Sequence, residues 1–435
     1  MRTKIKVKAI IMTVLVFSVV SFIVFAQAVF NLGSFQELEI ALIFYWLGKL
    51  AGLTGVLFLS LLIFSGDTAR YFDRFFGLDK IIKFQRKFAL FTMIFVLAHP
   101  LFFILSDWSI LFFLIPNFSA PPLALGAMSL YIFIMVMVAS KMYKRISYNV
   151  WQYIHIFTYI LFGFSLYHAF YLGSDSGNWL LKVIYLILLA AVALGAVYRT
   201  NYKLKQRRRG KFYVEGVKRE TKDVFTLALK PEKKFSFQAG QFCFLRLNQA
   251  KLYARHPFTI VSSPGEAALC FIVKIQGRFT RALSELKPGD EIIVDGPFGV
   301  FTVKNRAKDL VLIAGGVGLA PFISLIRDRL AAATTQQVVL LYGAKTEVDL
   351  IYRQELDGIK QSWFKKVYIL NDHSSGLAAG EIGYINQDII EKYVKNISNS
   401  LFYICGPETM KVSLKKILAK LKVSRKNIII EDFFW

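Results

Sequence analysis

The chain has 435 residues, 55% of them hydrophobic, and a mean hydropathy of +0.47. It is long enough for more than one domain and too apolar for an average soluble protein. The formal net charge of +25 does not indicate nucleic acid, because the Lys and Arg residues cluster beside apolar segments, where they orient a membrane protein near anionic headgroups. We therefore expect a lipid bilayer, and no nucleic acid, among the partners.

Six apolar segments in the first half of the chain are long enough to span a bilayer. They are Ala9–Phe30, Glu39–Phe64, Phe88–Leu105, Pro122–Ser140, Val150–Leu172 and Trp179–Tyr198. The N-terminus, the second and fourth connections and the exit of the last segment are basic, whereas the other three connections carry no Lys or Arg. The positive-inside rule predicts a multi-pass protein of the plasma membrane with both termini in the cytoplasm. Whether the first segment is cleaved after Ala26-Gln27-Ala28, as in a signal peptide, stays open.

Three of the five histidines, His99, His155 and His168, lie inside these apolar segments. An imidazole in hydrocarbon is costly, so each is a candidate functional residue, and haem iron is the partner that we expect. The alternative is hydrogen bonding between helices. His155 and His168 are ~20 Å apart along a helix, which leaves room for one site in each leaflet. An ideal helix also turns them ~140° from each other, so spacing alone does not place both on one face.

From residue 211 the pattern changes to short β-rich segments separated by turns, which predicts a small antiparallel β-barrel. The expected strands are Phe212–Val217, Val224–Leu229, Phe242–Leu247, Ala268–Ile275 and Glu291–Val294. After about residue 307, strands and helices alternate as in a doubly wound parallel α/β sheet. We expect three domains: a membrane bundle at 1–205, the barrel at 206–304 and the α/β domain at 305–435. The cysteines lack metal-ligand spacing and are expected to be free thiols in a reducing cytoplasm: Cys243, Cys270 and Cys405.

Two short motifs in the barrel region fit a flavin. In Arg255-His256-Pro257-Phe258-Thr259-Ile260, a strand places Arg255, Pro257 and Thr259 on one face, so that the cation suits a phosphate and the hydroxyl suits the polar edge of the isoalloxazine. Gly277-Arg278-Phe279-Thr280-Arg281 opens an expected helix at Thr280–Leu286, whose first N–H groups, with Thr280, make a pyrophosphate site. Each motif by itself also fits a plain turn with surface arginines.

Two glycine turns in the α/β region fit a dinucleotide. In Leu312–Pro321, an apolar strand runs through Gly315, Gly316 and Gly318 into a helix whose first turn tolerates Pro321. A second strand ends in Cys405-Gly406-Pro407. We expect both turns at the carboxyl ends of parallel strands, where open α/β sheets bind ligands, with Cys405 facing the nicotinamide.

These motifs, in this order, resemble the ferredoxin–NADP reductase family over 211–435. With its membrane segments the whole chain resembles the bacterial branch of the ferric reductase and NADPH oxidase family. The resemblance implies FAD on the barrel, NAD(P)H on the α/β domain and b-type haem in the membrane. It implies that FAD is held by Arg255, His256, Pro257, Phe258, Thr259, Gly277, Phe279 and Thr280, and NAD(P)H by Gly315, Gly316, Gly318, Pro321, Cys405, Gly406 and Pro407.

The resemblance also suggests two further roles. Lys345 is the candidate partner for the 2′-phosphate of NADPH, although a surface lysine is usually only solvated, so NADH remains an alternative. Trp435 is the candidate for an aromatic ring that stacks on the flavin until nicotinamide displaces it. Thr259, Cys405 and Trp435 are therefore the catalytic candidates.

In the same family, haem lies between the third and fifth spans, which carry two histidines each. Here the fifth span has both, His155 and His168, but the third has only His99, because Gln85 stands at the inner position. Glutamine is a poor ligand for haem iron. The resemblance therefore implies an outer haem on His99 and His168. Either His155 binds an inner haem that lacks a sixth ligand, or that haem is absent and His155 is a polar core residue.

We expect a transmembrane oxidoreductase that moves electrons from NAD(P)H through FAD and haem to an acceptor on the outer face. The short outer connections carry no metal-binding cluster, which favours O₂, with formation of superoxide, over a ferric chelate. A membrane-anchored flavin reductase without a working haem relay, and an ion pathway through the helices, are the alternatives. No obligatory protein partner is evident.

Overall fold

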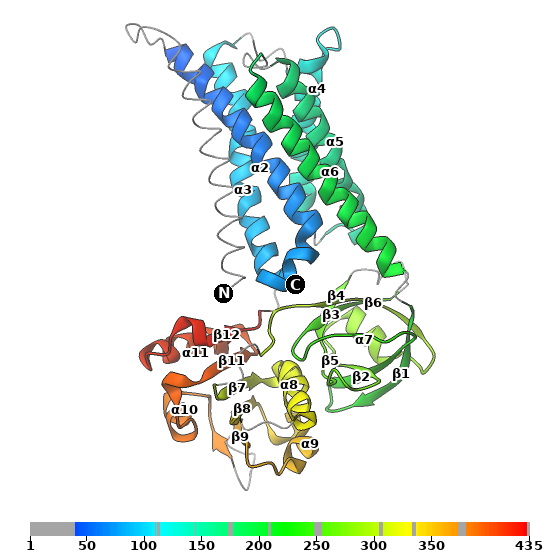
Figure 1. Ribbon diagram of the computed structural model, residues 1–435, viewed down its shortest axis with the longest axis vertical. Coiled ribbons are helices and arrows are strands. Elements are labelled where there is room, and N and C mark those ends of the chain that lie inside the picture. Colours follow the sequence, from blue (N-terminus) through cyan, green and yellow to red (C-terminus); the bar gives the residue numbers. More distant parts are fainter. Residues whose placement is uncertain are drawn as a thin grey trace. The chain divides into compact units, whose positions relative to one another are not determined.

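Figure 1 shows the computed structural model of the chain, which describes residues 40–108, 110, 114–143, 145–172, 177–207, 210–247, 255–303, 308–332, 336–372 and 380–432. The chain divides into two compact units, Met1–Lys205 and Gln206–Trp435. The first expected span, Ala9–Phe30, and the terminal Trp435 lie outside the described residues.

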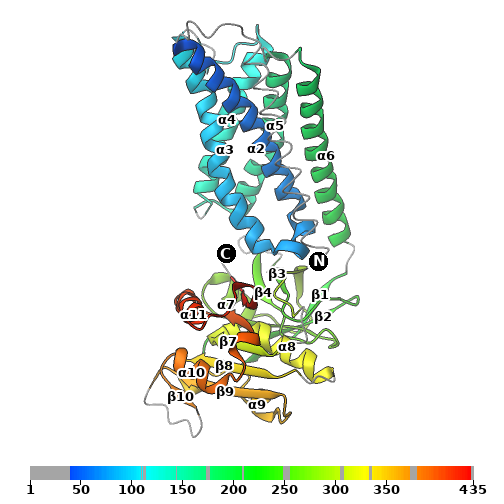
Figure 2. The ribbon, with the colours of Figure 1, turned by 60° about the vertical axis from the view of Figure 1, so that its left-hand side comes forward.

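The first unit consists of long apolar helices that lie side by side (Figures 1 and 2). Five helices among the described residues are long and apolar enough to cross a membrane. They are α2 (Ile40–Phe76), α3 (Leu78–Ser106), α4 (Pro121–Lys141), α5 (Tyr148–Leu172) and α6 (Trp179–Arg207). These helices match five of the expected spans. Helices α2, α3 and α6 extend well beyond the expected bounds, because hydropathy falls at the flanking charged residues whereas the helical hydrogen bonds continue past them.

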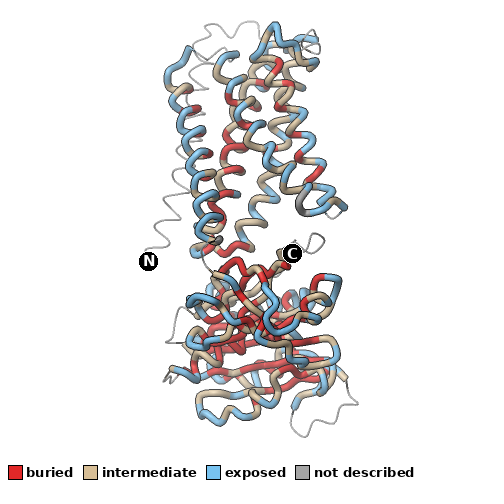
Figure 3. The backbone as a smooth tube through the Cα atoms, turned by 90° about the vertical axis from the view of Figure 1, so that its right-hand side faces the viewer, coloured by how far each residue is buried: buried red, intermediate tan, exposed pale blue. Residues whose placement is uncertain are grey.

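The surface of this unit is apolar. Leu161 and Phe162 of α5 are only 2% exposed and pack in a cluster with side chains of α2, α4 and α6. The outer faces of the helices, pale blue in Figure 3, still carry large apolar side chains such as Leu90, Leu101 and Leu194. An apolar surface of this extent is unfavourable in water and fits contact with lipid, in agreement with a multi-pass membrane protein.

The second unit begins with a six-stranded antiparallel sheet in the order β4-β3-β6-β1-β2-β5. The strands are β1 (Phe212–Arg219), β2 (Val224–Pro231), β3 (Phe242–Arg246), β4 (His256–Thr259), β5 (Leu269–Lys274) and β6 (Glu291–Phe298). A single bridge between Ile260 and Phe271 links the two edge strands, β4 and β5. The expected end of β6 at Val294 is wrong, because Phe298 still pairs with Phe242 of β3.

A six-stranded parallel sheet follows, in the order β10-β9-β8-β7-β11-β12. Its strands are β7 (Leu310–Gly315), β8 (Val338–Ala344), β9 (Phe364–Leu370), β10 (Glu381–Ile382), β11 (Leu401–Cys405) and β12 (Ile428–Ile430). The helices of this region are α8 (Ala320–Ala331), α9 (Arg353–Gly358), α10 (Gln387–Tyr393) and α11 (Glu408–Lys420).

The parallel sheet is buried on both faces, since successive residues of a strand point to opposite sides. Leu312 and Tyr403 lie in one apolar cluster with α8, whereas Val311 and Ile404 lie in another with α11. The chain runs from β7 outward to β10 and then returns to the other side of β7 as β11. The strand order therefore reverses between β7 and β11, the place at which sheets of this class bind ligands.

Candidate functional site

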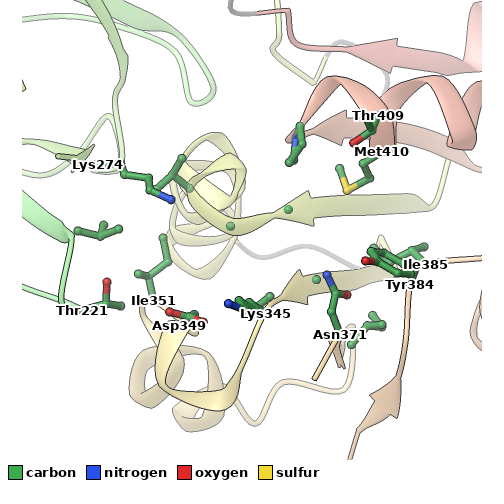
Figure 4. A pocket seen from close by; sticks show the side chains of 18 of the residues that line it. Thr221, Lys274, Lys345, Asp349, Ile351, Asn371, Tyr384, Ile385, Thr409 and Met410 are labelled. Atoms are coloured by element: carbon green, nitrogen blue, oxygen red, sulfur yellow. The ribbon is translucent and has the colours of Figure 1, made fainter. Parts of the chain in front are cut away.

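A cavity of about 780 Å³ opens over the carboxyl ends of the parallel strands (Figure 4). The turn after β7 forms one part of its wall, and the ends of β8 and β9 and the start of α11 form others. Residues of β5 and of the β1–β2 turn close it from the antiparallel sheet. The site residues predicted from the sequence that line it are Gly315, Gly316, Lys345 and Pro407.

The two glycine turns meet at this cavity, as expected from their places after β7 and β11. A Cβ atom added to Gly318 would lie 2.6 Å from the carbonyl carbon of Cys405, and one added to Gly315 would lie 2.8 Å from Cδ of Pro407. Side chains other than hydrogen therefore do not fit where the two turns pack. Pro321 occupies the first turn of α8, where a proline is tolerated. This backbone arrangement suits close approach of a dinucleotide phosphate.

Cys405 is the last residue of β11 and is only 1% exposed. Burial raises the pKa of its thiol well above the ordinary value, so the group is neutral at physiological pH. A buried neutral thiol is a poor nucleophile. The structure therefore places Cys405 as a packing residue beneath the glycine turns, while its predicted contact with nicotinamide stays a prediction.

Sequence reasoning missed several polar residues of the cavity wall. Lys274, at the end of β5, lies across from Lys345 (Figure 4). Its ammonium is 3.3 Å from Asp223. Asn371 and Tyr384 also line the cavity. None of these residues belongs to a recognisable motif, and they reach the cavity only because distant segments pack together.

The two flavin motifs also meet in the structure. The ring of His256 on β4 stacks on Phe279 of α7 (Arg278–Ser284), with centroids 4.1 Å apart, and Phe258 lies 6.3 Å from the same ring. Burial lowers the pKa of His256, so the imidazole is neutral at physiological pH. The guanidinium of Arg255 lies 4.9 Å from the centroid of Phe244.

Helix α7 differs from the expected Thr280–Leu286, which is wrong at both ends. The hydroxyl of Thr280 accepts hydrogen bonds from the N–H groups of Gln276 at 2.9 Å and Gly277 at 3.1 Å. It thereby caps the helix, which begins at Arg278 with Gly277 as its N-cap. Thr259 is 6% exposed, so its hydroxyl lies in the sheet interior more than on an open surface.

Two of the membrane histidines face each other across the bundle. The rings of His99 on α3 and His168 on α5 are 5.9 Å apart between centroids and nearly perpendicular, at 88°. His99 donates from Nδ1 to the carbonyl of Gly48 on α2 at 2.9 Å, and His168 donates from Nδ1 to the carbonyl of Pro122 on α4 at 2.9 Å. Because Nδ1 carries the proton in both rings, Nε2 is the nitrogen with a lone pair for a ligand.

Both imidazoles rest against a glycine four residues after the carbonyl that they contact. A Cβ atom at Gly52 would lie 2.5 Å from Nδ1 of His99, and one at Gly126 would lie 2.8 Å from Cε1 of His168. The same arrangement therefore occurs twice, once on α2 and once on α4. Sequence reasoning missed these glycines. Within the described ranges no group of three or more His, Cys, Asp or Glu side chains could hold a metal ion, so a metal bound here would rest on the two imidazoles.

His155 and Gln85 are arranged differently from the His99–His168 pair. His155 interacts through Nδ1 with the carbonyl of Trp151 at 3.1 Å and through Nε2 with Ser140 Oγ at 3.4 Å, and its ring lies 3.9 Å from Trp151. Gln85 donates from Nε2 to Ser65 Oγ at 3.2 Å. Both ring nitrogens of His155 therefore have protein partners. The expected opposition of His155 and Gln85 does not occur, because each turns to a different neighbouring helix.

Family comparisons divide the chain into three segments. Residues 51–166 match a ferric reductase like transmembrane component, residues 211–302 an FAD-binding domain, and residues 312–416 an oxidoreductase NAD-binding domain. The chain is a ferric reductase-like oxidoreductase. With its five apolar helices, this oxidoreductase is a membrane protein that uses NAD(P)H and FAD.

The ferric reductase-like chain is similar to parts of several other reductases. It is 28% identical over 233 residues to the reductase component of propane 2-monooxygenase from Mycolicibacterium smegmatis, covering 51% of this chain and 66% of that protein. It is 34% identical over 164 residues to one polypeptide of the Na⁺-translocating NADH-quinone reductase from Pseudomonas paraeruginosa, covering 36% and 40%. The chain thus spans less than two thirds of the length of these relatives.

Solved structures are similar over about half of the chain. A ferredoxin reductase in carbazole 1,9a-dioxygenase has a TM-score of 0.47 and 24% identity, covering 52% of this chain and 69% of that one. A cytochrome P450 reductase from Amycolatopsis has a TM-score of 0.47 and 25% identity, covering 51% and 69%.

Proposed function

We propose that this oxidoreductase carries electrons across the plasma membrane, from cytoplasmic NAD(P)H through FAD and one b-type haem to an acceptor on the outer face. The observation that carries the proposal is the facing pair of imidazoles, His99 and His168, inside an apolar helical unit that belongs to the same chain as a flavin and nicotinamide module. The basic connections support cytoplasmic termini.

The residues around the pair fit haem iron. Two neutral imidazoles, each held through Nδ1 by a backbone carbonyl, form a ligand set typical of b-type haem. Gly52 and Gly126 leave each ring room against the neighbouring helix. One haem is favoured over two, because His155 uses both ring nitrogens in contacts with Trp151 and Ser140.

The second unit fits the other two cofactors. When bound, FAD accepts a hydride from NAD(P)H and passes its electrons on singly, and haem iron relays them one at a time. The glycine turns after β7 and β11 hold the dinucleotide phosphates at the cavity, and Lys345 binds a 2′-phosphate, which favours NADPH. Arg255, His256 and Phe279 hold the flavin, on an antiparallel sheet closed into a barrel. Trp435 covers the flavin until nicotinamide binds.

The proposed acceptor is O₂, which takes one electron to form superoxide and needs no dedicated binding site. A ferric chelate is the second candidate, because residues 51–166 match a ferric reductase like component. Both acceptors take single electrons, so the same relay serves either. No obligatory protein partner is required by this scheme.

An absorption spectrum of the purified full-length protein tests the proposal. We expect a Soret band, reduced b-type bands on addition of NADPH, and about one haem per FAD. His99→Ala and His168→Ala remove these bands, whereas His155→Ala keeps them. Superoxide is measured by a reporter that superoxide dismutase inhibits, with reduction of a ferric chelate measured in parallel.

The alternatives give different results. Loss of half of the haem in His155→Ala would contradict the single-haem arrangement. A flavin-containing protein with no haem would instead support a membrane-anchored flavin reductase. NADPH oxidation that reduces neither acceptor would contradict the proposed activity.

A further inference from the structure

A second cavity lies within the membrane unit, between α5 and the C-terminal part of α6. Its volume is about 260 Å³, and its lining residues are Ile156, Tyr159, Ala196, Arg199, Thr200 and Lys203. We call this cavity the α5–α6 groove. Arg199 and Lys203 stand one helical turn apart, and Ile156 and Ala196 provide apolar surface. Adjacent positive and apolar surfaces suit an amphipathic anion better than a free ion or an uncharged lipid.

The position of the groove along α6 corresponds to the level of lipid headgroups. Helix α6 begins at Trp179, which is 73% exposed, and exposed tryptophans are enriched at membrane interfaces. A helix rises about 1.5 Å per residue, so Arg199 lies about 30 Å farther along, which is the thickness of the hydrocarbon core. With Trp179 at one interface, Arg199 and Lys203 reach the opposite headgroup region.

Arg199 is held in place from inside the helical unit. Its Nη1 donates to Oδ1 of Asp67 at 3.1 Å and contacts the hydroxyl of Tyr159 at 3.3 Å. That hydroxyl lies 2.8 Å from both carboxylate oxygens of Asp67. Asp67 is 3% exposed, whereas the side chain of Arg199 is 30% exposed. The buried carboxylate therefore fixes the guanidinium while part of it remains open to the groove.

This arrangement is preorganised for a phosphate. A guanidinium that is already fixed loses less conformational freedom when it binds an anion. Asp67 offsets one of the two positive charges, so Arg199 and Lys203 together still present a net positive charge. We propose that the α5–α6 groove binds the phosphate of an anionic phospholipid, with Arg199 and Lys203 as its partners and Ile156 and Ala196 against the first part of the acyl chains.

Lipid binding to the purified full-length protein tests the proposal. The protein, in an uncharged detergent, is titrated with phosphatidylglycerol, phosphatidylcholine or inorganic phosphate, and bound lipid is counted by native mass spectrometry. We expect one tightly retained phosphatidylglycerol, which raises the melting temperature, and no comparable effect of the other two probes. Lys203→Gln weakens phosphatidylglycerol binding about fivefold, the order of effect of one cation near an anionic surface.

Matched variants separate this site from general charge. Lys205→Gln removes an exposed cation of the same helix that does not line the groove, and it leaves binding unchanged. Ala196→Leu fills the groove without altering charge and removes binding, while the melting temperature without lipid stays the same. Arg199→Gln is avoided, because it leaves Asp67 buried without its cation.

Three results would overturn the proposal. They are equal losses in Lys203→Gln and Lys205→Gln, undiminished phosphatidylglycerol binding in both Lys203→Gln and Ala196→Leu, and equal stabilisation by phosphatidylcholine. Stabilisation by millimolar inorganic phosphate alone, with no preference for the lipid, would likewise show that the groove binds a free anion.

Discussion

Single glycines determine whether the two imidazoles can face each other. We predict that Gly52→Ala reduces the haem content about tenfold, because its Cβ would lie 2.5 Å from Nδ1 of His99 and displace the ring from the Gly48 carbonyl. Gly126→Ala acts in the same way on His168. A pyridine haemochrome assay measures the effect. Gly163→Ala on α5 is the control, since its Cβ would meet nothing within 4 Å. Full haem content in Gly52→Ala would contradict this prediction.

Sequence reasoning reached the histidines but not their surroundings. His99 and His168 stand out because imidazoles are rare in apolar segments. Gly52 and Gly126 do not, because glycine is common in membrane helices and its role depends on which helix packs against it. Gln85 indicated correctly that the inner position departs from the family pattern. The partners of His155, on its own helix and on α4, could not be predicted, because they depend on side-chain rotamers.

At the scale of elements, a buried lysine of α11 fixes the last described part of the chain. Lys411 has a side chain only 5% exposed, and its ammonium lies 2.6 Å from Asp432 and 2.7 Å from Glu408. Burial alone would lower the pKa of Lys411, but the hydrogen bonds to these carboxylates raise it above its ordinary value. The raised pKa means that this stabilisation is complete at neutral pH and is lost only when alkaline pH deprotonates the lysine.

We predict that Lys411→Met destabilises the second unit by about 1–3 kcal/mol, since it removes charged hydrogen bonds and leaves Asp432 without this cation. The measurement is the temperature at which flavin is released. Lys415→Met, at an exposed position of the same helix, serves as the matched control and is expected to change that temperature little. Equal release temperatures for the two variants would count against a structural role of Lys411.

Whole elements were easier to predict than their ends. Five expected spans and the strand segments of the second unit correspond to observed helices and strands. The ends differ where a distant partner or a side chain decides them, as at β6, which pairs with β3 beyond the expected turn, and at α7, which Thr280 caps. Neither the partner strand nor the capping contact is visible in local composition.

At the scale of the whole molecule, the meeting of the two glycine turns was predictable because each follows a parallel strand and both strands end at the same edge. The opposite wall of the cavity was not. Lys274 comes from the antiparallel sheet, and its approach to the strand ends depends on how two separate sheets pack. Long-range contacts of this kind leave no periodic signal in the sequence.

The division of the chain at Lys205 and Gln206 predicts that the two units can be separated. The fragment Gln206–Trp435 has its own apolar clusters, so we expect it to fold alone, bind FAD and oxidise NADPH with ferricyanide as acceptor. It should show no reduced b-type bands and form little superoxide, since it lacks His99 and His168. The full chain, assayed in parallel, should show both. A fragment that retains flavin and forms superoxide as fast as the full chain would show that the membrane unit is not needed for transfer to O₂.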